Sequence, residues 1–86
     1  MSTLSEIVDA RSGTVRASGH LTVQGADLLR GTVEQLHRSG HDRVLLDLQY
    51  VQAADAAGLH VLHETGRSFA ADGGKLLVRV APDRVC

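Results

Sequence analysis

The stretch from Val44 to Leu62, VLLDLQYVQAADAAGLHVL, constrains the fold of this chain more than any other segment. It opens with an almost continuous apolar run, which is typical of a strand buried on both faces in a parallel or mixed sheet. The apolar positions then change to helical spacing, and Asp55 stands where the N-cap of that helix belongs. A buried strand that leads straight into a helix predicts an α/β fold.

Turn signals and changes of apolar period divide the rest of the chain into short elements. The predicted order is a strand at 4–8, a strand at 15–21, a helix after Gly25, a strand at 43–48, a helix from Asp55 that stops at Gly73, and a strand at 75–80. Ser12-Gly13 marks the hairpin turn, Gly19 interrupts the second strand, and Gly40 ends the first helix as a left-handed cap. Pro82 stands where a third helix would begin.

Both predicted helices are amphipathic. The first carries its apolar stripe on Leu29, Val33 and Leu36, with Leu28 beside it, and the second on Leu59, Leu62, Gly66, Phe69 and Ala70, opposite His60, His63, Glu64, Arg67 and Ser68. Two strand–helix–strand crossovers favour parallel pairing. We therefore expect one α/β domain over residues 1–86, with a central mixed sheet of about four strands and the helices packed on one face.

Composition and charge exclude several classes of function. Of the 86 residues, 43% are apolar and 22% are charged, which fits a globular domain and neither a disordered nor a membrane-spanning chain. The formal net charge is −1 and basic residues are scattered among acidic ones, so no basic face for nucleic acid is expected. Tyr50 and Phe69 are the only aromatic residues, so platforms for stacking bases are not expected either.

The amino-terminal sequence and the cysteine content indicate a location. The segment MSTLSEIVDA contains no basic stretch followed by a long apolar one, so neither a secretory signal nor a membrane span is expected. Cys86 is the only cysteine, so no internal disulfide can form and a reducing compartment fits best. We therefore predict a cytoplasmic protein that does not insert into a membrane.

No residue pattern in the sequence predicts a catalytic or metal site. His60 and His63 lie one helical turn apart beside Glu64, but the zinc-protease helix needs histidines four positions apart, and an obvious third ligand is missing. Asp47 and Asp55 bracket the turn before the second helix, where a strand end and an N-cap account for both. A nucleophile elbow would need a hydroxyl at this turn, which carries alanines instead. We therefore predict no enzyme, no cofactor and no bound metal.

The amino end of the second helix is the segment that best suits binding. Asp55-Ala56-Ala57-Gly58 combines the unpaired amides of a helix start with two small apolar side chains. This combination predicts a smooth surface for docking a protein rather than a reaction centre. The alternative is that Ala56 and Ala57 are simply good helix formers packed in a first turn.

Three motifs make the chain resemble the STAS family, whose best-known members are bacterial anti-sigma factor antagonists. Gly19-His20-Leu21 resembles the Gly-x-Leu that closes the family's second strand. The segment 44–48 with Val51 resembles its central strand, and 55–59 resembles the Asp-Ser-Ser-Gly-Leu that opens its second helix. The similarity extends from about Glu6 to Val85, and the shared order and spacing of the motifs make it specific.

The resemblance implies a function and a switch. In the family, a partner that is both an anti-sigma factor and a kinase phosphorylates the first serine of Asp-Ser-Ser-Gly. The unphosphorylated form binds this partner and frees the sigma factor. Ala56 stands at the matching position and Ala57 at the next, so neither can accept phosphate and the usual off-switch is absent. The resemblance therefore implies a protein that binds its partner constitutively or is regulated by partner abundance.

The chain departs from the family at further positions. Thr22 stands where the family often has an acidic residue, and Ala53 and Ala54 stand where it has larger apolar residues. Family members usually continue through a further helix, strand and helix, so we expect a C-terminally short STAS domain. Either the domain is minimal or truncated, or a partner or a second copy supplies the missing layer, because an uncovered sheet face favours association.

We therefore expect an anti-sigma factor antagonist-like module that sequesters an anti-sigma factor of the histidine-kinase-like type. The residues expected at the partner contact are Asp55, Ala56, Ala57, Gly58, His60, His63, Gly19, His20 and Thr22. Asp55 is expected to cap and position the turn, and the alanines to make the close contact. The alternatives are a small STAS subunit that binds the ATPase of a membrane (lipid) transporter, a nucleotide-binding regulatory domain, and a degenerate protein without a partner.

Overall fold

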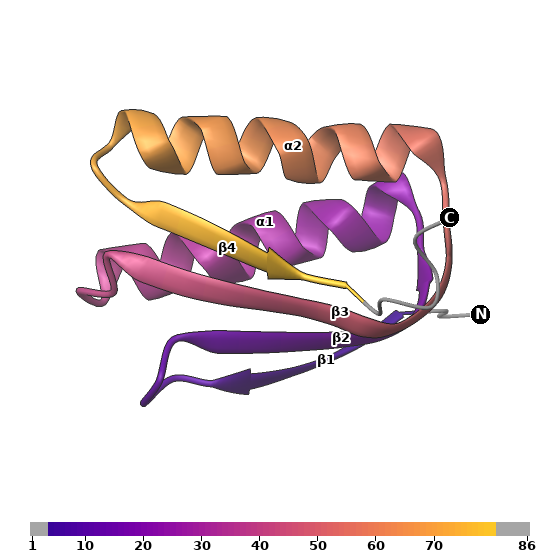
Figure 1. Ribbon diagram of the computed structural model, residues 1–86, viewed down its shortest axis with the longest axis horizontal. Helices are drawn as coiled ribbons and strands as arrows, with labels where there is room; N and C mark the ends of the chain where they lie inside the picture. The colour runs from indigo at the N-terminus through magenta and orange to yellow at the C-terminus, as the bar shows by residue number, and fades with distance from the viewer. Residues whose placement is uncertain (1–3, 81–86) are drawn as a thin grey trace.

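The computed structural model describes residues 4–80, which form four strands and two helices (Figure 1). In chain order these elements are β1 (Leu4–Asp9), β2 (Thr14–Leu21), α1 (Val23–Arg38), β3 (Arg43–Ala54), α2 (Ala56–Ala71) and β4 (Lys75–Arg79). The predicted sequence of elements is confirmed throughout this range. The third helix predicted at Pro82 lies outside the described residues.

The strands form a mixed sheet in the order β1-β2-β3-β4. β1 and β2 pair antiparallel as a hairpin, whereas β2 with β3 and β3 with β4 pair parallel. Each parallel pair is joined through one helix, as parallel pairing requires a crossover of this kind. Both helices lie on the same face of the sheet, so the described residues build two layers (Figure 1). The arrangement confirms the predicted α/β fold with its helices on one face.

The apolar core lies between the sheet and the two helices. Its buried residues are Val15, Ala17, Leu21, Ala26, Leu29, Val33, Leu36, Val44, Leu46, Leu48, Val51, Leu62 and Phe69. In the predicted stripe of α1, Leu29, Val33 and Leu36 are buried, whereas Leu28 beside it is 62% exposed. The stripe of α2 is confirmed only in part, because Leu59 is 47% exposed and Ala70 is exposed. Thr65 is buried in α2 instead, and its hydroxyl donates to the Val61 carbonyl at 2.8 Å.

Two element boundaries differ from the prediction by three residues or more, each for a local reason. α1 starts at Val23 rather than after Gly25, because Thr22 is its N-cap and the Thr22 hydroxyl oxygen accepts from the Gly25 N–H at 3.2 Å. β3 continues to Ala54 rather than ending at Leu48, because it stays paired with β2 over that length. The apolar run therefore marked only the first half of the strand.

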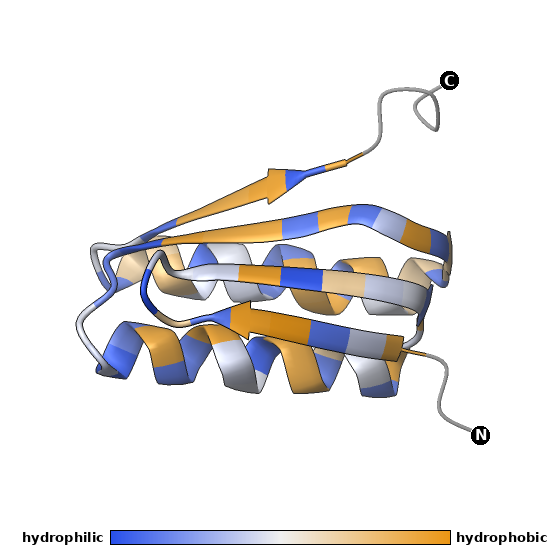
Figure 2. Ribbon diagram, turned by 90° about the horizontal axis from the view of Figure 1, so that it is seen from below, coloured by the Kyte–Doolittle hydropathy of each residue, from blue (hydrophilic) through white to orange (hydrophobic). Residues whose placement is uncertain are grey.

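β3 does not have the two covered faces that its apolar run predicted. Because side chains alternate along a strand, Val44, Leu46 and Leu48 point to the helices, and all three are buried. Leu45 points to the opposite face and is half-buried. Within residues 4–80 no helix covers this face, which Figure 2 views from below. We refer to it as the open sheet face.

β3 carries two more residues than β2 over their paired length. Thr14 pairs with Leu45 and Leu21 pairs with Ala54, so seven steps along β2 match nine steps along β3. The register shifts at two places, one of them directly after Asp47. Such bulges bend a strand and redirect the side chains next to them. Here they shape the half of β3 that leads into α2.

Candidate functional site

α2 begins at the carboxyl end of β3, where Asp55 has an extended backbone conformation (φ −79°, ψ 145°) as N-cap. The predicted N-cap position is confirmed, but the predicted capping by its side chain is wrong, since the Asp55 carboxylate makes no cap hydrogen bond within the described residues. The backbone holds the turn instead. The Asp55 N–H donates to the Leu21 carbonyl at 2.9 Å, and the Asp55 carbonyl accepts from the Leu59 N–H at 3.0 Å. The end of β2 thus positions the start of α2.

The first turn of α2 presents small side chains outward and packs tightly inward. Ala56 and Ala57 are exposed, whereas Gly58 is buried. A Cβ atom at Gly58 would lie 2.9 Å from the carbonyl oxygen of Thr22 and 3.0 Å from its carbonyl carbon. Such contacts are too short for a side chain, so this position needs glycine. The turn is therefore anchored directly on the junction between β2 and α1.

Gly19, His20 and Thr22 lie at the same end of the sheet as the start of α2, because the carboxyl ends of parallel β2 and β3 meet there. Gly19 has a φ of +100°, which favours glycine, and pairs with Val51 next to a register shift. His20 is exposed beside Ala53. Thr22 is half-buried and its hydroxyl caps α1. The structure therefore brings these residues to the predicted site, and their contact with a partner stays a prediction.

His60 and His63 lie on the exposed side of α2, as the helical period predicts. They follow Ala56 by four and seven positions, so the three residues share one stripe of the helix. His60 also lines a groove of about 570 Å³ between α1 and α2, whose walls include Arg38 and Glu64. Because the groove carries charges of both signs, it favours no particular class of ligand.

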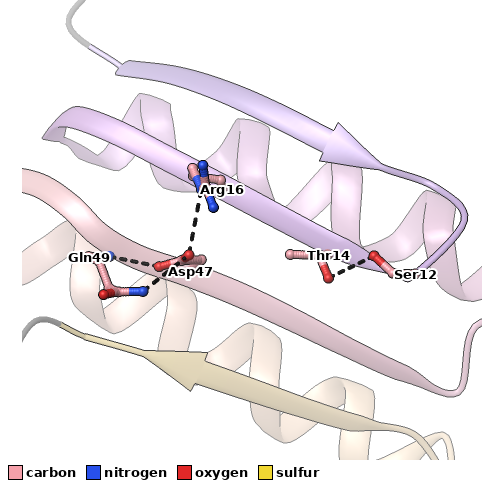
Figure 3. Close-up of polar contacts among 5 residues, drawn as sticks. All are labelled: Ser12, Thr14, Arg16, Asp47 and Gln49. Atoms are coloured by element: carbon pink, nitrogen blue, oxygen red, sulfur yellow. Dashed lines mark hydrogen bonds and ion pairs between the residues drawn. The ribbon is translucent and has the colours of Figure 1, made fainter.

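Asp47 is a buried acid inside β3, so its interpretation as a strand-end residue is wrong. It is 2% exposed, and its carboxylate accepts from the Gln49 N–H at 3.0 Å and from Gln49 Nε2 at 3.4 Å (Figure 3). Arg16 Nε lies 3.6 Å from its Oδ2. Burial raises the pKa of Asp47, but the two hydrogen bonds from Gln49 and the positive charges of Arg16 and Arg79 outweigh it, so the pKa lies below the ordinary value of 3.8. The ionised carboxylate closes the bulge of β3 and has a structural role.

Residues 4–80 contain neither a cluster of metal ligands nor a buried polar side-chain atom without a partner. Among residues 4–80, no three His, Cys, Asp or Glu side chains are grouped so that they could hold a metal ion. Every buried side-chain nitrogen or oxygen in that range has a hydrogen-bond partner, so no polar atom points unsatisfied into a cavity there. In the same range, no helix combines the length and the apolar character needed to cross a membrane.

A protein-family model described as "Mlab, STAS domain" matches residues 7–86. The chain belongs to this STAS family. The matched range includes all three motifs on which the family resemblance rests, namely 19–21, 44–51 and 55–59, so the resemblance is confirmed at the level of the family. A search of curated proteins finds no match for this STAS domain.

Two solved structures share the fold of this STAS domain. The STAS domain of an antisigma-factor antagonist from Rhodobacter sphaeroides is 17% identical and has a TM-score of 0.62, and the likeness covers 93% of this chain and 87% of that chain. The crystal structure of Mglu is 23% identical with a TM-score of 0.71, and the likeness covers 93% of this chain but 20% of that chain. This STAS domain therefore spans only a small part of Mglu. At these identities the likeness shows the fold alone.

Proposed function

We propose that this STAS domain is a protein-binding module that docks an anti-sigma factor of the histidine-kinase-like type on the amino end of α2 and thereby releases a sigma factor. The observation that carries the proposal is the first turn of α2, where Ala56 and Ala57 are exposed and Gly58 anchors the turn from beneath. The small side chains of Ala56 and Ala57 let a partner approach the first turn closely, and their burial costs little conformational entropy. We define the α2 docking surface as Asp55, Ala56, Ala57, His60 and His63, with His20 of the neighbouring strand.

Three other residues predicted at the contact act indirectly in this proposal. Gly58 is buried, and Gly19 and Thr22 are half-buried. They set the backbone path on which the exposed residues stand. Their substitution would therefore disturb the α2 docking surface through the fold rather than through a lost contact.

Ala56 takes the position of the phosphoacceptor in this proposal. A phosphate would bring a charge of about −1.5 to −2 at pH 7 into the α2 docking surface. Alanine has no hydroxyl to accept it, so binding is not switched off in this way. The amount of partner present would then set the extent of binding.

A second candidate partner is the ATPase of a membrane transporter. The matching family model is described by the name Mlab and not by anti-sigma activity, and this observation favours testing a second class of partner. Either partner would use the same α2 docking surface. The two candidates differ in the identity of the protein that is bound.

The test compares partner recovery by the natural sequence and by Ala56→Asp. Tagged proteins are incubated with native cytoplasm, and the retained proteins are identified by mass spectrometry. Because aspartate places a negative charge in the α2 docking surface, we expect retention to fall about tenfold or more. The same acid lies in the first turn of α2, where the helix dipole favours it, so the melting temperature should not fall.

Ala10→Asp is the matched control, because Ala10 is exposed in the turn between β1 and β2, at the opposite end of the sheet (Figure 1). This variant should retain the partner like the natural sequence. Equal recovery by Ala56→Asp would place the interface elsewhere, and recovery of a transporter ATPase would favour the second candidate. Intact-mass measurement of the complex after incubation with ATP should show no phosphate at this turn.

A further inference from the structure

On β3 and β4, the open sheet face carries two rows of charged side chains with an apolar row between them. The strand register gives the rows, in order along the sheet, as Arg43–Lys75, Leu45–Leu77 and Arg16–Asp47–Arg79. Side chains paired across strands point to the same face, and so do alternate residues along one strand. All three rows therefore share the face to which Leu45 points.

Apolar side chains on this face reach the solvent. Ile7, which pairs with Arg16, is 68% exposed, and Leu77 is 40% exposed. Tyr50 is 53% exposed, and the Arg16 guanidinium lies over its ring at 5.2 Å from the centroid. The helices of the described residues lie on the other face (Figure 2). Exposed apolar side chains on this face therefore occur on β1, β3 and β4, whereas β2 contributes polar ones there.

The open sheet face is positively charged although the formal net charge of the chain is −1. The register places the cations Arg16, Arg43, Lys75 and Arg79 and, within residues 4–80, the acids Asp9 and Asp47 on it. Both acids are engaged, Asp47 by Gln49 and Arg16 and Asp9 by the N–H groups of the following turn. Within the described residues Arg43, Lys75 and Arg79 form no ion pair, so the excess positive charge lies on β3 and β4.

We propose that the open sheet face docks an acidic amphipathic helix of a partner protein. The apolar stripe of this helix would lie on Leu45 and Leu77, and its acidic flanks would reach Lys75 and Arg79. A helix is about 10 Å wide and neighbouring strands are about 4.8 Å apart, so a single helix covers β3 and β4 together. The partner would thereby supply a helix layer on the second face of the sheet.

The charges distinguish this occupant from the others that a sheet face could take. Two copies stacked by their open sheet faces would bring cations against cations, which opposes association. For nucleic acid and for an anionic membrane, the carboxylate of Asp47 and the apolar row interrupt the cations that would contact phosphates. At a membrane each cation adds only about 1 kcal/mol. Arginine and tyrosine, in contrast, are enriched at protein interfaces.

The test uses a fluorescent synthetic peptide of about five helical turns, with leucines at helical spacing and glutamates on both flanks. Fluorescence anisotropy measures its binding to the natural sequence and to the double variant Lys75→Glu/Arg79→Glu. We expect the affinity to fall at least about tenfold in the double variant and to weaken as salt is raised. Lys75→Gln/Arg79→Gln should lose less, because it removes the attraction without adding repulsion.

Arg38→Glu/Arg67→Glu is the matched control, because it makes the same charge change at exposed positions of α1 and α2. It should bind the peptide like the natural sequence, as should Ala56→Asp, because the α2 docking surface is separate from this one. Equal affinity of all variants would overturn the proposal, as would equal affinity for a peptide of scrambled order. Tighter binding of duplex DNA or of phosphatidylglycerol vesicles, lost in Lys75→Glu/Arg79→Glu, would overturn it in favour of a phosphate-bearing ligand.

Discussion

The two helices of this domain start side by side but are held in different ways. At the start of α1 the Thr22 hydroxyl accepts a hydrogen bond from the Gly25 N–H, so the cap is local and made by a side chain. At the start of α2 the Asp55 carboxylate makes no such bond within residues 4–80, and the turn is fixed by the Leu21 carbonyl and by the packing of Gly58. A start that is anchored from the interior leaves its outer side chains available for a partner.

The start of α2 depends on the start of α1, but the start of α1 does not depend on α2 in the same way. Gly58 of α2 rests on the backbone of Thr22, which also accepts the Ala26 N–H at 2.8 Å in the first turn of α1. α1 is capped within its own segment, whereas α2 depends on atoms of the β2–α1 junction. We therefore expect damage at the α1 start to reach the α2 docking surface, and four substitutions test this difference.

The largest effect is expected for Gly58→Ala. The new Cβ atom would lie 2.9 Å from the Thr22 carbonyl oxygen, a backbone atom that cannot yield without moving the start of α1. The free energy of unfolding should fall by about 1–3 kcal/mol, as in overpacked cores, although alanine favours a helix. Chemical denaturation measures the change. Gly31→Ala in α1 is the control, because among the described residues no atom beyond its chain neighbours and its own helix backbone lies within 4 Å of its Cβ position, and it should gain about 0.5–1 kcal/mol.

A smaller effect separates the two N-caps directly. Thr22→Ala removes a side-chain hydrogen bond and should lower the free energy of unfolding by about 1 kcal/mol. Asp55→Ala removes only the interaction of an exposed charge with the helix dipole, so the loss should be about 0.3 kcal/mol and should vanish at high salt. Denaturation at low and high salt gives both values. If Asp55→Ala lost as much stability as Thr22→Ala at both salt concentrations, the Asp55 side chain would cap α2 in solution.

A further effect concerns the strand that leads into α2. The folded-state pKa of Asp47 lies below the ordinary value, so its ionised form stabilises the fold above that value, and this stabilisation is lost as the pH falls through the folded-state pKa. Asp47→Asn should therefore be less stable than the natural sequence at neutral pH, and the difference should disappear in acid. Amide hydrogen exchange should show the weakening in β3 and the α2 start rather than in α1. A difference that is independent of pH would contradict the assignment.

The order of elements could be predicted because it depends on local signals. The apolar period of α1 located its buried stripe, and Gly40, with a φ of +107°, ends that helix as predicted. The position of the α2 start could be predicted for the same reason, since Asp55 stands directly before the apolar positions change to helical spacing. What failed were the second half of β3, where polar residues hide a paired strand, and the buried position of Thr65.

The tertiary features of the site could not be predicted from local signals. In the sequence, nothing distinguished Gly58 from any other glycine in the first turn of a helix. Only the folded chain shows that the backbone of Thr22 lies against it. The lone acid in the run VLLDL was the one available sign that Asp47 is buried and bonded. Arg16 and Arg79 are far apart in the sequence and meet on one face only through the strand register, so the basic open sheet face was not expected.

Because β3 has two more residues than β2 over their paired length, the fold depends on the exact length of this strand. The segment from Asp47 to Ala54 pairs with the shorter segment from Arg16 to Leu21 of β2. It must end where Gly58 can pack against the backbone of Thr22. Removing one residue would turn every following side chain of β3 to the other face of the sheet. It would also break the packing of Gly58 against Thr22. Substitutions at Gln49 or Tyr50 should therefore be tolerated more readily than any insertion or deletion between them and Asp55.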